Sequence, residues 1–454
     1  MQKQDLLDSF GKQLELLSVP PAANFHIALS GGLDSVVLLH LFARLRERGA
    51  NLTLNAHHIH HGLSENGDCW MDFCAALCVT LKIDFTCSKV HLNRQTRTSL
   101  EALAREKRYH CLTQSLSENS YLVTAHHQDD QLETLLLALK RGAGNTGLQG
   151  IHHQQKLKLG YLIRPLLNFS RAQLADYATC FELHWIEDES NHDQLFDRNF
   201  IRHSITPLLK NRWPGIAKSV ARTATICQEQ QQILDEIAAQ DFSASVFYFL
   251  NQQALKFEQL KQLSTGRRNN LLRFWFKDNC LDYPSAAQLH VIWTDVVLAT
   301  DDALPVMQFK GYSIRRYRKH LYLLKDLDIA VNRGESVTWQ GEQQISLADG
   351  RVKLLFIQDA DNHNRSDIFK YQENAKIEIC FRQHLPAQLT CQPIGRNGSR
   401  SLKKLLHEYH VPPWLRDLIP FIVIDGELRA AIGLWQCQTS RSEIGVHNLS
   451  IVFA

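Results

Sequence analysis

The chain has 454 residues, a formal net charge of +3 and 44% hydrophobic residues. This length predicts two or three domains, and the composition is that of an ordinary globular protein. No apolar run approaches the roughly 20 residues that span a bilayer, and the first residues lack the apolar segment of a signal peptide. We therefore expect a cytoplasmic protein with no membrane partner. The eleven cysteines form no recognisable framework and are expected to be reduced thiols.

Strand and helix signals alternate over the N-terminal part of the chain. Strands are expected over residues 25–29, 52–59, 83–90 and 121–125, and helices over 65–81, 98–116, 130–140 and 170–181. Two of these helices open with the spacing of a capping box, Thr98 to Glu101 and Ser170 to Gln173. The alternation predicts an α/β fold with a doubly wound parallel sheet. Ligands of such sheets bind beyond the carboxyl ends of the strands.

A glycine-containing loop follows the first expected strand. Two adjacent glycines let the backbone approach phosphate oxygens, and the helix start that follows adds N–H donors. Asp34 in such a loop implies an accompanying cation, so we interpret it as a magnesium ligand. An ordinary serine–glycine turn with an aspartate cap is the alternative. The loop is not a Walker-type loop, because it lacks Gly-Lys-Ser/Thr. It resembles the pyrophosphate (PP) loop of the N-type ATP pyrophosphatases, which implies ATP binding by Ser30, Gly31, Gly32, Leu33, Asp34 and Ser35.

A second polar segment follows the fourth expected strand, from His126 to Thr134. Asp130 and Glu133 are three residues apart, so both carboxylates lie on one face of the expected helix. Opposite Asp34, they would hold magnesium between ATP phosphates. Acids at a helix start also complement its dipole, which is the alternative. His126 and His127 at the strand end favour catalysis over this alternative.

Two further groups of side chains lie near the expected sheet edge. The run from His57 to His61 follows the second strand, whose alternating side chains cannot supply four zinc ligands. We expect one or two of these histidines to line the nucleotide pocket. Arg105 and Arg108 are three residues apart on an expected helix. Either could bind a carboxylate or phosphate of a substrate, and a solvated basic face is an equally good alternative for each.

Four more sequence blocks distinguish one family among the enzymes that share this loop. They are 139–144, 147–151, 185–191 and 196–203. Together with the two strand-end segments they resemble the tRNA(Ile)-lysidine synthetase family over residues 1 to about 215. The resemblance implies that ATP, Mg²⁺ and free L-lysine are used to modify the wobble cytidine of tRNA(Ile) with a CAU anticodon. Cytosine O2 attacks the α-phosphate and releases pyrophosphate, and the lysine ε-amine then displaces AMP from C2.

The resemblance also implies residue roles. Asp34 and Asp130 would hold magnesium, and His126 and Glu133 would position phosphate, metal or lysine. A carboxylate or histidine base is expected to deprotonate lysine. Three further residues are carried over as lying near the active site: Arg198, Asn199 and Arg202. The stretch 198–222 holds six Lys/Arg and no acid. Such a basic surface either binds the phosphates of an RNA backbone or is simply solvated.

The second half lacks βα alternation. With residues 1–218 as the catalytic domain, we expect a mainly helical tRNA substrate-binding domain over 219–330. Its aromatic run 274–276 recurs at helical spacing and predicts core packing. The basic run 314–320 predicts a strand that contacts either RNA or solvent.

A linker is expected over 326–343, followed by a small α+β domain over 344–454. Residues 421–425 and 428–433 predict a hairpin. This domain resembles the family's C-terminal domain, which implies recognition of the tRNA acceptor stem. The basic residues assigned to that contact are Arg396, Arg400, Lys403, Lys404 and Arg416.

Two alternative functions stay open. A tRNA thiolase or an adenylating amidotransferase could use the same loop, but no Cys-x-x-Cys pair and no N-terminal cysteine nucleophile occur. A non-enzymatic tRNA-binding protein with a decayed nucleotide site is disfavoured by the retained carboxylates. The sequence leaves the oligomeric state open, a homodimer being one alternative.

Overall fold

The computed structural model describes residues 3–20, 23–60, 62, 66–90, 100–114, 116–249, 252–300, 303–326, 335–348, 350, 352–358, 368–372, 374–438 and 447–453. The chain forms two compact units, residues 1–233 and 234–454. Each unit has hydrophobic cores of its own. No helix in the described ranges is long and apolar enough to cross a membrane.

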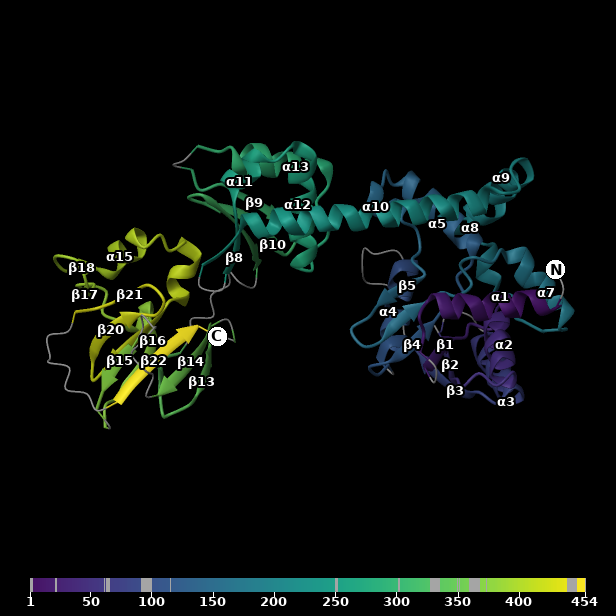
Figure 1. Cartoon of the computed structure of the whole chain (residues 1–454), viewed down its shortest axis with the longest axis horizontal. Helices are drawn as coiled ribbons and strands as arrows, with labels where there is room; N and C mark the ends of the chain where they lie inside the picture. The colour runs from purple at the N-terminus through teal and green to yellow at the C-terminus, as the bar shows by residue number, and fades with distance from the viewer. Residues whose placement is uncertain are drawn as a thin grey trace. The chain divides into compact units, whose positions relative to one another are not determined.

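The first unit is built on a six-stranded sheet in the order β3-β2-β1-β4-β6-β5 (Figure 1). The strands are β1 (Asn24–Ala28), β2 (Thr53–His60), β3 (Asp84–Lys89), β4 (Ser120–Val123), β5 (Gln154–Lys156) and β6 (Tyr161–Ile163). Only the β5–β6 pair is antiparallel. The strand order reverses at β1, between β2 and β4, which places the ligand-binding edge of the sheet beyond the ends of β1 and β4.

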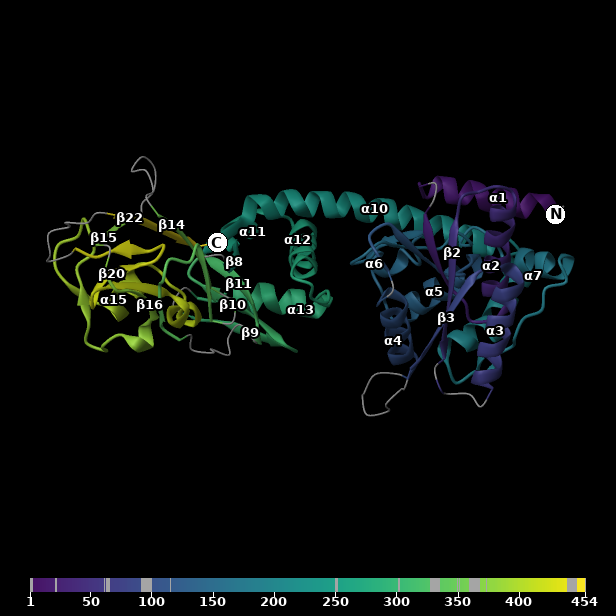
Figure 2. The same cartoon turned by 90° about the horizontal axis from the view of Figure 1, so that it is seen from below.

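Helices cover both faces of this sheet. The helices of the first unit before α10 are α1 (Lys3–Leu16), α2 (Leu33–Glu47), α3 (Gly67–Leu81), α4 (Leu100–Gln114), α5 (Gln128–Lys140), α6 (Asn145–Leu148), α7 (Arg171–Cys180), α8 (Asp197–Phe200) and α9 (Thr206–Arg212). Figure 2 shows α4 on one side of β2 and β3, and α2 and α3 on the other. The predicted doubly wound α/β fold is confirmed for this unit.

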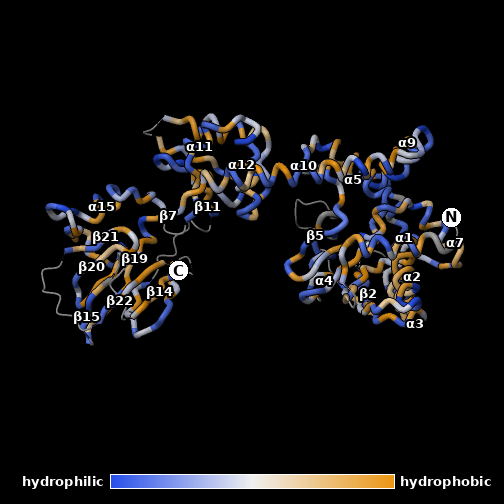
Figure 3. Tube along the Cα trace, viewed as in Figure 1, coloured by the Kyte–Doolittle hydropathy of each residue, from blue (hydrophilic) through white to orange (hydrophobic). Residues whose placement is uncertain are grey.

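Side-chain alternation along the strands explains the two layers. Phe25 and Ile27 of β1 are fully buried in the core beneath α1, α2, α3 and α7. Leu122 of β4 points the other way and packs with Leu112 of α4. Successive side chains of a strand alternate between faces, so one apolar sheet supplies two cores. Figure 3 shows the apolar character of α2.

The predicted capping box of α7 is confirmed. Ser170 Oγ accepts a hydrogen bond from Gln173 N at 3.3 Å, and Gln173 Oε1 accepts one from Ser170 N at 2.9 Å. Both bonds satisfy donors that a helix start leaves unpaired. The other predicted box begins at Thr98, which lies outside the described residues.

The second unit contains a middle region of helices and an antiparallel sheet. Helix α10 (Ile216–Ser245) leads into it, and the helices that follow are α11 (Phe257–Gln262), α12 (Thr265–Asp278) and α13 (Ala286–Val291). The sheet has the order β7-β8-β11-β10-β9, formed by β7 (Val246–Phe249), β8 (Gln252–Lys256), β9 (Val306–Phe309), β10 (Tyr312–Tyr317) and β11 (His320–Lys325). Trp275 and Phe276 are fully buried, so the prediction of core packing for these aromatics is confirmed.

The strand predicted over 314–320 is confirmed only up to Tyr317, where β10 ends in a turn that leads into β11. Within it, Arg316 contacts neither RNA nor solvent. It is 3% exposed, and its guanidinium donates to the carbonyl oxygens of Val297, Ala299 and Thr300. A buried arginine keeps its charge only where acceptors surround it. Arg316 therefore fastens the end of a helical segment to β10.

The C-terminal region packs two sheets around a shared core. One sheet has the order β12-β16-β19-β20-β21 and the other β13-β14-β22-β15. Their strands are β12 (Val337–Thr338), β13 (Gln344–Leu347), β14 (Val352–Gln358), β15 (Ile368–Tyr371), β16 (Ile377–Phe381), β19 (Pro420–Ile424), β20 (Glu427–Ala431), β21 (Trp435–Gln436) and β22 (His447–Phe453). The predicted hairpin is β19–β20. The linker expected over 326–343 is wrong in part, because β12 pairs with β16.

A small hairpin and a helix complete this region. They are β17 (Thr390–Cys391), β18 (Arg400–Ser401) and α15 (Leu402–Glu408). The structure joins Cys391 to Cys437 in a disulfide, so the expectation of reduced thiols is wrong for these two cysteines. Folding brings their Cα atoms to 6.0 Å from each other although they are 46 residues apart in sequence. The spacing of the cysteines in the sequence does not indicate this pairing.

Candidate active site

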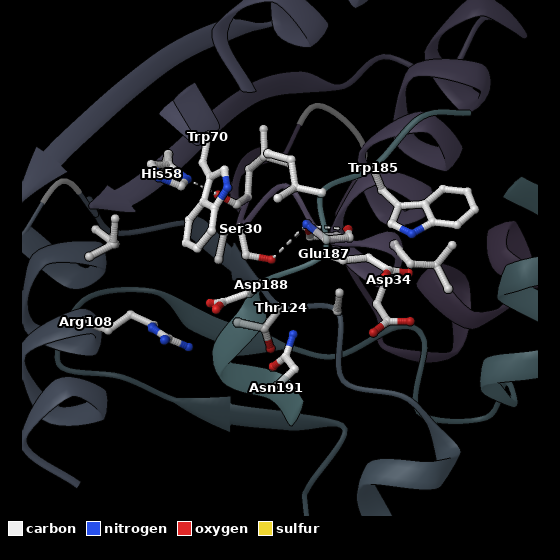
Figure 4. A pocket seen from close by; sticks show the side chains of 18 of the residues that line it. Ser30, Asp34, His58, Trp70, Arg108, Thr124, Trp185, Glu187, Asp188 and Asn191 are labelled. Carbon is white, nitrogen blue, oxygen red and sulfur yellow. Dashed lines mark hydrogen bonds between the residues drawn. The ribbon is translucent and has the colours of Figure 1, made fainter. Parts of the chain in front are cut away.

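A cavity of about 1140 Å³ opens beyond the carboxyl ends of β1, β2 and β4 (Figure 4). It is lined by the loop after β1, by one side of α4 and by the segment 185–191. Figure 4 shows Ser30 and Asp34 on the loop, Arg108 across the cavity, and Asp188 and Asn191 between them. The segments that the sequence placed at one sheet edge therefore meet around one space, as expected for a doubly wound sheet.

The glycine-containing loop has the close-packed backbone that the sequence predicts. Gly31 adopts φ +87°, and its carbonyl oxygen accepts a hydrogen bond from Ile186 N at 2.9 Å. A Cβ at this position would lie 3.0 Å from the Ile186 side chain and 3.2 Å from Cys74 Sγ. Both the positive φ and the crowding require glycine.

The serines of the loop are joined to each other. Ser30 Oγ lies 3.0 Å from Ser35 Oγ, and the Ser35 hydroxyl donates to Gly32 O at 3.0 Å. Ser30 and Gly32 line the cavity together with Leu33, at the N-terminus of α2. The helix start and the two hydroxyls present donors to the space where an anion would lie.

Asp34 and Asp130 flank a single buried imidazole. His127 Nε2 lies 3.5 Å from Asp34 Oδ2, and His127 Nδ1 lies 3.5 Å from Asp130 Oδ2. The His127 side chain is 1% exposed. Burial alone lowers the pKa of His127, but Asp130 and Asp34 outweigh burial and raise it. The two carboxylates lie on the same side of the sheet, next to the loop, and the sequence did not anticipate His127 between them.

Asp130 and Glu133 both bind arginines from the helical segment 197–212. Arg198 Nε donates to Glu133 Oε2 at 2.9 Å, and Arg198 Nη2 donates to Asp130 Oδ1 at 2.8 Å. Arg202 also contacts both carboxylates. Burial alone raises the pKa of Asp130, but His127, His126 and Arg198 outweigh it and hold that pKa below its usual range. The predicted nearness of both arginines to the site is thus explained by ion pairs.

His126 lies on the wall of the cavity with its Nδ1 2.9 Å from Thr124 Oγ1. Burial lowers the pKa of His126 to about 3, despite the opposing effect of Asp130. The ring is therefore neutral at physiological pH. It can exchange hydrogen bonds with a ligand but is a weak proton acceptor.

Three histidines of β2 line the cavity, where the sequence predicted one or two: His57, His58 and His60. His61 lies outside the described residues. His58 Nδ1 lies 2.8 Å from Leu29 O and 3.7 Å from Cys74 Sγ. Burial raises the pKa of Cys74 to about 12, so this thiol stays neutral and unreactive beside the loop.

Other candidates lie at the rim. Arg105 and Arg108 both line the cavity, which favours the ligand-binding alternative over a purely solvated face. Asn199 does not line it, and its side-chain amide donates to Asp193 O at 2.9 Å. Two aromatic residues, Trp70 and Trp185, also line the cavity, and no sequence pattern predicted a role for them. Trp185 opens one of the blocks that carry the resemblance, so its position there was the available signal.

Models of three known domains match the chain in order. A PP-loop domain matches residues 6–209, the TilS substrate binding domain residues 255–322, and the TilS substrate C-terminal domain residues 377–452. The tRNA(Ile)-lysidine synthase of Photobacterium profundum is 40% identical over 92% of this chain and 94% of its own length. The chain belongs to the tRNA(Ile)-lysidine synthase family.

Other members of this family match at similar levels. The tRNA(Ile)-lysidine synthase of Serratia proteamaculans is 40% identical over 92% of this chain and 93% of its own length. That of Shigella flexneri is 37% identical, with coverages of 94% and 95%. The matches extend over nearly the full length of both partners, so the family assignment covers all three regions. The domain boundaries 1–218, 219–330 and 344–454 stay predictions.

The C-terminal basic residues lie around helix α15. Lys403 and Lys404 are exposed on the helix itself. Glu408 lies near both predicted arginines, with its carboxylate 2.6 Å from Arg396 Nη1 and 3.6 Å from Arg400 Nε. The fifth residue, Arg416, directs its Nε to Val411 O at 3.2 Å, so it supports a turn of the backbone.

Proposed function

We propose that this chain, like the lysidine synthases it matches, joins free L-lysine to C2 of the wobble cytidine in tRNA(Ile) with a CAU anticodon. ATP is the co-substrate, and AMP and pyrophosphate are the products. The observation that supports this most directly is the arrangement of Asp34 and Asp130 on either side of His127, next to the glycine loop and the cavity. A decayed nucleotide site would have no reason to keep the buried carboxylate of Asp130 and the partly buried carboxylate of Asp34 in this arrangement.

The loop is suited to hold the β- and γ-phosphates of ATP. Ser30, Gly32 and Ser35 offer hydroxyl and backbone donors at the N-terminus of α2. Binding at this helix start draws negative charge toward a positive partial charge. Cytosine O2 then attacks the α-phosphate, the bond to the pyrophosphate oxygen breaks, and pyrophosphate leaves on the loop.

Magnesium fits the carboxylates beside the loop. Asp34 Oδ1 is buried without a hydrogen-bond partner, so this oxygen is free to coordinate a cation. Asp130 already accepts hydrogen bonds but keeps lone pairs for a further ligand. No cluster of three or more metal-ligating side chains occurs among the described residues, and Mg²⁺ is commonly held by one or two carboxylates together with substrate phosphates. Magnesium would neutralise the phosphate charge as pyrophosphate leaves.

The second step needs a neutral lysine ε-amine. It attacks C2 of the adenylated cytidine, AMP departs with the C2 oxygen, and the amine loses a proton. His126 is poorly suited to accept this proton because its pKa is about 3. We assign His126 a hydrogen-bonding role toward substrate and leave the proton acceptor to a carboxylate that lines the cavity.

Binding of the tRNA involves all three regions. The middle and C-terminal regions match substrate domains of the family. Lys403 and Lys404 present exposed positive charge to a phosphate backbone. A cytoplasmic location follows from this role in tRNA modification.

Product analysis tests the proposal. The purified chain is incubated with unmodified tRNA(Ile), ATP, Mg²⁺ and lysine, and the wobble nucleoside is identified by mass spectrometry. Lysidine formation with one pyrophosphate released per tRNA is the expected result. A thiolated or unchanged cytidine, in a reaction where the tRNA binds, would contradict it.

A further inference from the structure

Two exposed aromatic side chains follow one another on the helical segment that bounds the cavity. Phe196 precedes α8 and is 37% exposed, and Phe200 ends α8 and is 46% exposed. The backbone hydrogen bond from Phe200 N to Phe196 O, at 3.0 Å, makes them neighbours one turn apart. Large apolar side chains exposed next to each other form a continuous apolar patch, and such a patch marks a candidate binding surface.

His203 shows where this pair lies relative to the cavity. It lies three residues after Phe200, on the same side of the helical segment, and it lines the cavity. His203 Nε2 lies 2.9 Å from the carbonyl oxygen of Asn191, another lining residue. The buried Ile201 and the ion-paired arginines occupy the other sides of the segment. Phe196 and Phe200 therefore face solvent beside the mouth of the site.

A third exposed aromatic residue lines the cavity itself. Trp185 is 37% exposed, and Figure 4 shows it among the residues that line the cavity. We call Trp185, Phe196 and Phe200 the aromatic rim. The cavity lining offers two exposed cations to RNA phosphates, Arg105 and Arg171. It also carries the acidic side chains of Glu187, Asp188 and Glu189, so contact with RNA at this place rests on the aromatic rings rather than on net charge.

We infer that the aromatic rim stacks unpaired bases of the anticodon loop while the wobble cytidine enters the cavity. The inference rests on the proposed function, because a target cytidine must leave its stack to reach the α-phosphate. The bases next to it then lose stacking partners, and flat aromatic side chains replace those partners regardless of sequence. Phe196 and Phe200 would hold neighbouring bases outside the cavity, and Trp185 the extruded base within it.

An RNA hairpin that carries a CAU loop tests the inference. 2-Aminopurine replaces the adenine after the cytidine, and its fluorescence falls when the base stacks. The full chain with ATP is expected to bind this hairpin and quench the fluorescence. Phe200→Leu keeps an apolar side chain but removes the ring, so we expect binding at least about fivefold weaker and reduced quenching. Phe200→Tyr is expected to retain both signals.

Matched measurements separate a stacking role from a folding defect. Phe196→Leu provides a second ring deletion, and Leu16→Ala removes an exposed apolar side chain on α1, far along the chain from the rim. ATP affinity is expected to be unchanged in all variants. Unchanged hairpin affinity and quenching in both ring deletions would overturn the inference, even if the enzyme forms lysidine. Absence of lysidine from the unmodified chain would instead reject the proposed function.

Discussion

Arg202 donates two hydrogen bonds to Glu133, from Nε to Oε1 at 2.7 Å and from Nη2 to Oε2 at 2.9 Å. Glu133 is 2% exposed, so its charge depends on this partner and on Arg198. The pair joins α5 to the π-helical turn Ile201–Ile205 and so fixes the wall of the cavity. The arginines that the sequence assigned to substrate contact also hold the site together.

Loss of this ion pair should destabilise the first unit. Arg202→Ala leaves a buried carboxylate short of donors, which we expect to cost about 2 kcal/mol and lower the Tm by about 4–8 °C. Arg202→Lys should recover little, because lysine cannot form the two parallel bonds. Thermal unfolding measures both. Arg212→Ala, an exposed arginine on α9, is the control.

A double-mutant cycle decides whether the effect comes from the pair. Glu133→Gln removes the charge that Arg202 neutralises. The combined change should therefore cost less than the sum of the single changes. Strict additivity would contradict the coupling.

The carboxylate of Asp34 should be needed for pyrophosphate release. Asp34→Ala removes the buried oxygen that has no protein partner, and with it the proposed cation ligand. We expect the rate of pyrophosphate release to fall at least about a hundredfold. Asp176→Ala, an exposed acid on α7, should leave it unchanged. Turnover of Asp34→Ala near that of the parent would remove the magnesium role.

Gly31→Ala should weaken ATP binding through crowding. Its Cβ would lie 3.0 Å from the Ile186 side chain, in a backbone with φ +87°. The loop must shift, so we expect a higher KM for ATP. Gly49→Ala is a matched control, since Gly49 has φ +94° but no atom near the added Cβ. It should cost about 1 kcal/mol of stability and leave the KM unchanged. Equal KM values for the two variants would exclude crowding.

The positive charge of β18 and helix α15 should appear in the salt dependence of tRNA binding. Arg400→Ala with Lys403→Ala removes two positive charges, which we expect to reduce the slope of log K against log[salt] by up to about 2. ATP binding should be unaffected. Lys353→Ala with Lys370→Ala removes two exposed lysines from the other sheet of the region and is the control. An unchanged slope in the first variant would refute RNA contact at α15.

His126 should make stability depend on pH. Its folded pKa of about 3 lies below the usual histidine value near 6.5, so the unfolded chain binds the extra proton between these values. Stability from the neutral ring is fully present above about pH 6.5 and is lost as the pH falls toward the folded pKa. Between pH 7 and pH 5, the Tm of His126→Gln should therefore decrease by less than the Tm of the parent. Equal losses would contradict the lowered pKa of His126.

The sequence by itself determined the alternation of strands β1 to β4 with helices in the first unit and the helix α7, but it did not predict α1, β5 or β6. Its strand periodicities, the Ser170–Gln173 box and the Ser30–Ser35 loop are local features, and local backbone chemistry decides them. Because parallel strands end at one edge, the sequence also determined that the loop and the segment after β4 would meet. The sequence blocks are also sufficient to indicate the family, because they are features of the chain itself.

Tertiary structure alone decided which charges pair and which side chains are covered. The insertion of His127 between Asp34 and Asp130, the disulfide of Cys391 and Cys437, and the burial of Arg316 all join residues through packing. Residue type and spacing cannot report such partners, because a charged side chain looks the same in sequence whether it faces water or a buried carboxylate. Folding sets that difference, since desolvation makes an unpaired charge costly only where neighbouring elements exclude water.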